Sequence, residues 1–314
     1  MRRRLFPAHL DLVETAITVI RDVQRVVARK IRLNPYRAFA PLEVQGRNNK
    51  KLLGVDFAAE SEAADMLRAK LPGLRALGEE SLTDADLDLS REESLVVLMD
   101  MVDGTDLLER GLSNWCSAMI FFHPPERRIL GAFVGLFEEG VYYATEKVAP
   151  HFRSFTRDSA ARKLTAPPSD VEARFKWADR FEDASIAYYG QKNKNFLSLL
   201  GKRCFAKSVG STNEKAALRI YNFAGNPMMM KVIDGYKRID AVFDVHGQHP
   251  HDVAPGAYIA SRVDGVVFTD ISGARIDLAA SLLRPAHEDH KLKYVLAGSH
   301  SLAEEIRAAV ALEA

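Results

Sequence analysis

Residues 95–105 read Leu-Val-Val-Leu-Met-Asp-Met-Val-Asp-Gly-Thr, and this stretch decides the interpretation of the chain. The apolar run Leu95–Met99 predicts a buried β-strand. Two carboxylates, Asp100 and Asp103, follow it directly, and burying them is costly unless something neutralises their charge. A hard divalent cation such as Mg²⁺ does so, because its preferred ligands are carboxylate and carbonyl oxygens. The backbone amides of the Gly-Thr pair that ends the stretch can then face an anion.

Two further acidic clusters lie where a loop meets a predicted element. Gly-Glu-Glu-Ser at 78–81 follows a short predicted strand at 74–77, and His-Asp-Val-Ala-Pro-Gly at 251–256 opens an apolar helix. Taken alone, each has a structural explanation. The first is an ordinary turn sequence, and Asp252 is a natural helix N-cap.

Together, the three clusters resemble the motifs of the inositol monophosphatase family. The segment at 100–105 is similar to the family's Asp-Pro-Ile/Leu-Asp-Gly-Thr/Ser, and the segment at 78–81 matches its Gly-Glu-Glu partner. The segment at 251–256 is similar to the family's Trp-Asp-x-Ala-x-Gly, and a glycine-containing segment at 263–267 follows it as in the family. The order and spacing agree from Asp56 to the C-terminus.

The resemblance implies one site built from all three clusters. Each cluster would supply side-chain metal ligands, and one backbone carbonyl would supply a further ligand. Glu80 would lie next to these ligands without binding the metal itself. The turn after the strand would bind phosphate, and two segments nearer the C-terminus would face the rest of the substrate. The implied metal ligands are Glu79, Asp100, Val102, Asp103 and Asp252, and the implied substrate-binding residues are Gly104, Thr105, Gly210, Ser211 and His251.

Asp56 matches the last position of a family segment that reads Asp-x-Val-Thr-x-x-Asp. The resemblance implies that it pairs with Thr105 to activate the attacking water, whereas its structural interpretation is a helix N-cap. At the first Asp and the Thr of that segment this chain has Lys50 and Leu53. Neither side chain can act as a general base at neutral pH. These departures motivate an alternative, a degenerate family member that binds metal and a phosphorylated ligand without catalysis.

His251 occupies the position of the family's Trp and has two neighbours, His246 and His249. Three histidines invite a zinc interpretation, but their spacing in a loop fits substrate-binding or structural roles better. The segment 222–230, with its run of three methionines, resembles an insertion relative to the family. Methionine runs usually fill cores.

Helical and strand patterns together predict an α/β (α+β) chain whose sheets are covered by helices, and the resemblance implies a layered α/β/α/β/α sandwich. We expect an N-terminal half at 1–160, carrying the first two metal motifs, and a C-terminal half at 161–314. The predicted helices are 8–32, 56–70, 192–200, 211–223, 252–262 and one from 301. The predicted strands are 74–77, 95–99, 115–122, 129–137, 141–145, 185–189, 203–207, 266–269 and 294–297.

Composition limits the partners and the location. Lys plus Arg is 43 and Asp plus Glu is 42, so the net charge of +1 provides no field to attract nucleic acid or an anionic membrane. Only two cysteines occur, Cys116 and Cys204, without zinc-type spacing. The N-terminus does not resemble a signal peptide, and the apolar runs are too short to cross a bilayer. We expect a cytoplasmic protein, and the resemblance implies a homodimer.

The function implied by the resemblance is Mg²⁺-dependent hydrolysis of a small phosphomonoester by metal-activated water. The substrate would be an inositol monophosphate, a sugar phosphate or a histidinol-phosphate-like compound. The alternatives are a bisphosphate phosphatase, acting on fructose 1,6-bisphosphate or 3′-phosphoadenosine 5′-phosphate, and the non-catalytic binder described above. An unrelated α/β protein, whose acidic motifs are only caps and turns, is a third hypothesis.

Overall fold

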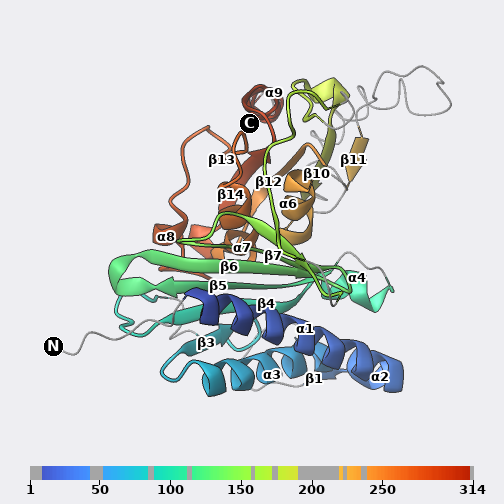
Figure 1. The fold of residues 1–314 in the computed structure, drawn as a ribbon, viewed down its shortest axis with the longest axis vertical. Coiled ribbons are helices and arrows are strands. Elements are labelled where there is room, and N and C mark those ends of the chain that lie inside the picture. The colour runs from blue at the N-terminus through green and yellow to red at the C-terminus, as the bar shows by residue number, and fades with distance from the viewer. Residues whose placement is uncertain are drawn as a thin grey trace.

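The computed structural model describes residues 9–42, 52–83, 88–111, 115–156, 160–171, 176–189, 219–221, 225–234 and 239–311. Its elements form layers (Figure 1): two helices, a seven-stranded sheet, further helices, a five-stranded sheet and a last helix. This arrangement confirms the expected α/β/α/β/α layering.

The first layer consists of α1 (His9–Leu33) and α3 (Gly54–Lys70), which lie side by side beneath the larger sheet (Figure 1). The apolar positions of α1 recur every three or four residues, so they form one stripe, and the structure buries that stripe. Between these helices come the short α2 (Pro35–Ala38) and a two-stranded sheet of β1 (Pro41–Leu42) and β2 (Leu52–Leu53).

The seven-stranded sheet has the order β3-β4-β5-β6-β7-β8-β9. Its only parallel pair among the described strands is β3 with β4, and the others are antiparallel. Alternate residues of β4 face opposite cores: Val96 and Leu98 pack between the sheets, while Val97 and Met99 pack against α1 and α3. The apolar run is continuous because both faces of this strand are buried. The strands are β3 (Arg75–Gly78), β4 (Val96–Asp103), β5 (Cys116–His123), β6 (Arg128–Leu136), β7 (Gly140–Thr145), β8 (His151–Ser154) and β9 (Arg162–Lys163).

The five-stranded sheet has the order β11-β10-β12-β14-β13. Helices α6 (Asn226–Ile233) and α7 (Pro250–Ala260) fill the space between the two sheets, and α9 (His300–Ala311) covers the far face of the smaller one. The short α4 (Thr105–Glu109) and α8 (Leu278–Ser281) lie in connections. The strands are β10 (Ser185–Tyr189), β11 (Arg219–Tyr221), β12 (Ala241–Gln248), β13 (Val267–Asp270) and β14 (Leu292–Ala297).

Most predicted elements are present within a few residues of their expected ends, but one prediction is wrong. The helix expected at 211–223 is a strand over Arg219–Tyr221, because this segment pairs in parallel with β10 and forms the edge of the smaller sheet. The segment 222–230 contains most of α6, and its Met228–Met230 run is buried in the central core, as expected for a methionine run. The elements predicted at 192–200 and 203–207 lie outside the described residues.

The change from one sheet to the other comes after Lys163, since β9 still belongs to the larger sheet. One apolar cluster contains residues from both sheets and from α6 and α7, so the halves share a core. Among the described residues, no helix combines the length and apolar composition needed to cross a bilayer.

Candidate active site

The parallel pairing of β3 and β4 brings the first two acidic clusters together. Gly78 lies opposite Met99, and the Glu79 amide donates a hydrogen bond of 2.9 Å to the Met99 carbonyl. Because parallel strands end at the same edge of a sheet, Glu79 is adjacent to the start of the Asp100–Asp103 segment.

The end of β4 departs from regular pairing in a way that orients both carboxylates. An Asp100 carboxylate oxygen accepts a hydrogen bond of 2.9 Å from the Val102 amide. The β4–β5 register shifts between Asp100 and Asp103, which lets both side chains turn toward the same side. Gly104 then adopts φ 99°, a left-handed conformation suited to glycine, and α4 begins at Thr105.

Asp252 reaches the same place from the first turn of α7. It is not the N-cap predicted by its structural interpretation, because α7 begins after His249, which makes no side-chain capping bond. The charge of Asp252 raises the pKa of both Asp100 and Asp103, so the three carboxylates lie close enough to interact. A segment from the C-terminal half of the sequence therefore converges on the strand-end motif.

Asn226, the first residue of α6, forms hydrogen bonds that link the strand-end motif to α7. The sequence interpretation did not identify this residue. Its side-chain amide lies 3.0 Å from an Asp103 carboxylate oxygen and 2.8 Å from the Asp252 carbonyl, and donates to both. Its amide oxygen accepts from the Gly256 amide at 2.7 Å. Asn226 is fully buried. A glycine followed by a polar residue at the start of a helix was the signal that could have found it.

Burial and mutual repulsion make these carboxylates hard to ionise. Burial, followed by the charges of Asp103, Asp252 and Glu60, raises the pKa of Asp100 well above its ordinary value. Burial and the charge of Asp252 raise the pKa of Asp103 to about 6. A cation bound among these oxygens would reverse the repulsion and favour the ionised forms.

Asp56 and Thr105 meet across 49 positions of sequence. The Thr105 hydroxyl lies 2.8 Å from an Asp56 carboxylate oxygen and 2.9 Å from the Val102 carbonyl. Asp56 is buried within the first turn of α3, whose N-cap is Leu53, so the N-cap interpretation of Asp56 is wrong. Leu53 itself packs in the core beneath the larger sheet.

Glu60, one helical turn after Asp56, is a second acidic residue that the sequence interpretation missed. Its carboxylate accepts a hydrogen bond of 2.8 Å from the Glu80 amide, and it is buried. A Cβ atom at Gly78 would lie 2.1 Å from the Glu60 carboxylate, so any larger residue there would have to displace the Glu60 side chain. The spacing of four residues from Asp56 was the available signal, since residues i and i+4 share a helix face.

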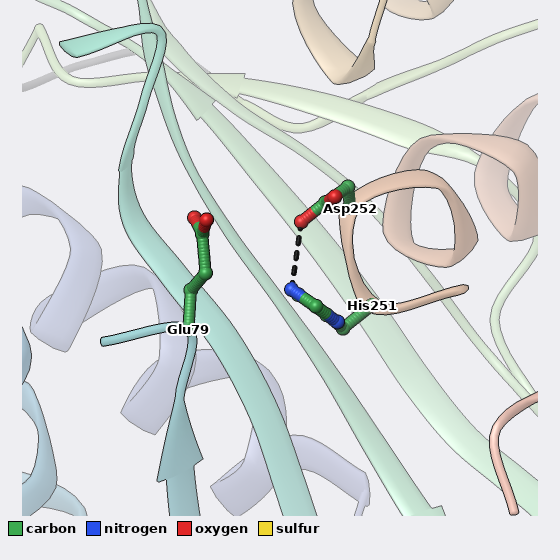
Figure 2. A group of neighbouring side chains, drawn as sticks. All are labelled: Glu79, His251 and Asp252. Carbon is green, nitrogen blue, oxygen red and sulfur yellow. Dashed lines mark ion pairs between the residues drawn. The ribbon is translucent and has the colours of Figure 1, made fainter. Parts of the chain in front are cut away.

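His251 is buried and lies against the acidic cluster rather than in open space. Figure 2 shows Glu79 at the end of its strand facing His251 and Asp252 at the start of α7. One ligand atom from each of these three residues lies within 4.8 Å of the other two. The side chain of His251 stacks against His249, with ring centroids 5.6 Å apart.

This donor set suits a divalent cation. The carboxylates of Glu79, Asp100, Asp103 and Asp252 and the carbonyl of Val102 could supply oxygen ligands, in a setting where burial and neighbouring negative charge raise the pKa of Asp100 and Asp103. The expected substrate residues Gly210 and Ser211 lie outside the described residues, as do Lys50 and Cys204. Cys116 is buried beside Asp103, at 3.5 Å from its carboxylate.

Solved structures reproduce this layering across nearly the whole chain. An inositol monophosphatase (IMPase) of Thermotoga maritima aligns with 97% of this chain and 100% of its own, at a TM-score of 0.65 and 15% identity. The chain has the inositol monophosphatase fold. An IMPase/NADP phosphatase aligns over 97% of both chains at a TM-score of 0.67 and 16% identity.

Inositol monophosphatase II of Staphylococcus aureus aligns over 96% of this chain and 97% of its own, at a TM-score of 0.62 and 19% identity. No family sequence model matches the chain, and no curated protein sequence matches it either. At these identities the likeness establishes the IMPase fold, and the chemistry has to be argued from the residues.

Proposed function

We propose that this chain is a Mg²⁺-dependent phosphomonoester hydrolase. The observation that carries the proposal is convergence: carboxylates from β3, β4 and α7 interact with one another directly beside the Asp56–Thr105 pair. Similar structures were solved with inositol monophosphate, with 2′-AMP, and with NADP and Ca²⁺. These support a small phosphorylated substrate and a divalent ion.

Different residues of the chain would bind the metal ions and the phosphate. Divalent ions held by Glu79, Asp100, Asp103, Asp252 and the Val102 carbonyl would neutralise phosphate charge and lower the pKa of water. The Gly104 and Thr105 amides would hold phosphate oxygens at the turn that opens α4.

The Asp56–Thr105 pair would orient the attacking water. When the Thr105 hydroxyl donates its single proton to the Asp56 carboxylate, its lone pairs can accept from a water molecule. The proton leaving that water is then taken up through Thr105 toward Asp56. Glu80 would support this arrangement from behind, through the contact of its amide with Glu60.

The non-catalytic alternative loses its main support. It was motivated by Lys50 and Leu53, which could have signalled a loop that misplaces Asp56. Leu53 is instead a core residue at the start of α3, and Asp56 still reaches Thr105. The Asp56–Thr105 contact therefore supports a catalytic pair that would not depend on the two family residues that precede it.

Release of inorganic phosphate tests the proposal. The panel should contain inositol monophosphate, sugar phosphates, histidinol phosphate, 2′-AMP, NADP, fructose 1,6-bisphosphate and 3′-phosphoadenosine 5′-phosphate, each with Mg²⁺ and with a chelator. We expect Asp103→Asn and Asp252→Asn to abolish release, and the exposed Asp65→Asn, which changes charge equally, to leave it intact. Unchanged turnover in the first two variants would refute the site. No release from any substrate, despite bound metal, would restore the binder hypothesis.

Two predictions from the sequence remain: a cytoplasmic location, expected from composition and the N-terminal sequence, and a homodimer, implied by the resemblance. Light scattering coupled to size exclusion measures the mass directly, and a species of 34.9 kDa would contradict the dimer.

A further inference from the structure

A buried imidazole stands beside the carboxylates of this site. His251 is 4% exposed and its Nε2 lies 2.8 Å from an Asp252 carboxylate oxygen, with Glu79 facing the pair (Figure 2). The imidazole nitrogen is a possible metal ligand, whereas the ligand set expected from the sequence contains only oxygen atoms. The short contact between His251 and the Asp252 carboxylate therefore needs a chemical explanation.

The other face of the ring determines which nitrogen carries the proton. His251 Nδ1 lies 2.7 Å from the Pro285 carbonyl, which can only accept, so Nδ1 is the donor. In the neutral ring Nε2 then presents a lone pair to the Asp252 carboxylate. Two acceptors at 2.8 Å repel each other unless a second proton or a metal ion joins them. Metal-binding histidines typically donate the remote N–H to a carbonyl or carboxylate in just this manner.

The spacing of the two atoms matches adjacent positions around a six-coordinate ion. With metal–ligand bonds of about 2.1 Å, a separation of 2.8 Å corresponds to an angle of about 84°, close to the 90° of an octahedron. A tetrahedral ion with bonds of about 2.0 Å would separate them by about 3.3 Å. A Glu79 carboxylate oxygen lies within 4.8 Å of a ligand atom of each of the two residues, so a small movement of its side chain would bring it to the same ion. The stack on His249 and the bond to Pro285 hold the ring in place.

We propose that His251 is a metal ligand, and that the position it shares with Glu79 and Asp252 takes a six-coordinate transition-metal ion such as Mn²⁺ in preference to Mg²⁺. Imidazole is a poor partner for Mg²⁺ and a good one for first-row transition metals. Mg²⁺ then suits the all-oxygen position formed by Asp100, Asp103 and the Val102 carbonyl. The inference rests on the metal site of the proposed function and not on hydrolysis itself.

Pulsed electron paramagnetic resonance of the chelator-stripped protein, reloaded with one equivalent of Mn²⁺ in the presence of Mg²⁺, tests ligation without substrate. We expect ¹⁴N modulation on the Mn²⁺ signal of the wild-type protein and its loss in His251→Gln. In calorimetry, His251→Gln should lower Mn²⁺ affinity about tenfold or more, and Mg²⁺ affinity less than about threefold. The matched control is His246→Gln, an exposed imidazole of the same segment, which should change neither value.

Several outcomes would overturn the inference. Absence of ¹⁴N modulation in the wild-type protein does so directly, even if the variant fails to fold. Modulation that survives in His251→Gln would assign the nitrogen to another residue. Equal losses of Mn²⁺ and Mg²⁺ affinity would show that His251 only positions Asp252. Phosphate release without any ¹⁴N coupling would reject this inference and leave the proposed function standing.

Discussion

Replacing Asn226 by alanine should weaken the whole site, because this one side chain joins three segments. It donates to Asp103 and to the Asp252 carbonyl, and it accepts from the Gly256 amide, all within the buried core. Alanine leaves each of these groups without that partner. Losses of about 1 kcal/mol for each neutral group and about 1.5–3 kcal/mol for the charged one give about 3–5 kcal/mol.

Urea unfolding in the presence of a chelator measures this loss in the metal-free state. The matched control is Asn34→Ala, which removes the exposed N-cap of α2 and should cost about 1 kcal/mol or less. Asn226→Ala should also weaken Mg²⁺ binding below pH 7, because the Asn226 hydrogen bond lowers the pKa of Asp103. A destabilisation no larger than that of the control would refute the view that Asn226 holds Asp103 and Asp252 in register.

Three further perturbations test neighbouring parts of the site. Thr105→Val should lower kcat by roughly 10²–10⁴-fold with Mg²⁺ affinity unchanged, and Thr105→Ser should recover most of it; full activity in the valine variant would exclude the pair with Asp56. Gly78→Ala should displace Glu60 and lower the melting temperature by several degrees, as a loss of about 2 kcal/mol implies; an unchanged melting curve would contradict the close approach. The pKa of Asp103 is raised to about 6 in the folded protein, so between about pH 4 and 6 the folded, metal-free protein binds a proton that the unfolded chain does not. As pH rises through that window, Asp103 therefore lowers the free energy of unfolding by up to about 3 kcal/mol. Saturating Mg²⁺ should therefore raise the melting temperature more at pH 7.5 than at pH 5, and an equal shift at both would mean that Mg²⁺ does not compete with these protons.

The regular elements of the larger sheet were predictable because their patterns are local. The stripe of α1 and the doubly buried strand β4 show their periodicity directly in sequence. The strand at Arg219–Tyr221 was not predictable in this way, because its conformation depends on pairing with Ser185–Ala187 of β10. Helix α6 was missed for another reason: it is only eight residues long and mostly apolar, and a short apolar run does not by itself distinguish a helix from a strand.

Within the site, motif residues were easier to find than the residues that hold them. Glu79, Asp100, Asp103 and Asp252 stand in recognisable clusters. Asn226 and Glu60 act through contacts with partners distant in sequence, and a single sequence does not show such pairs. The immediate surroundings of His251 were equally hidden, since the bond to Pro285 spans 34 positions.

Asp56 and Asp252 do not have the geometry that helix-capping residues require. A capping side chain accepts from the amides of its own helix start, yet the N-caps of α3 and α7 are Leu53 and His249, three residues before Asp56 and Asp252. Asp56 instead contacts a hydroxyl 49 positions away. Asp252 faces an imidazole and adds its charge to two other buried carboxylates. Local stability would be served better by apolar side chains at such places, so the accumulated negative charge supports the proposal that these residues bind divalent cations.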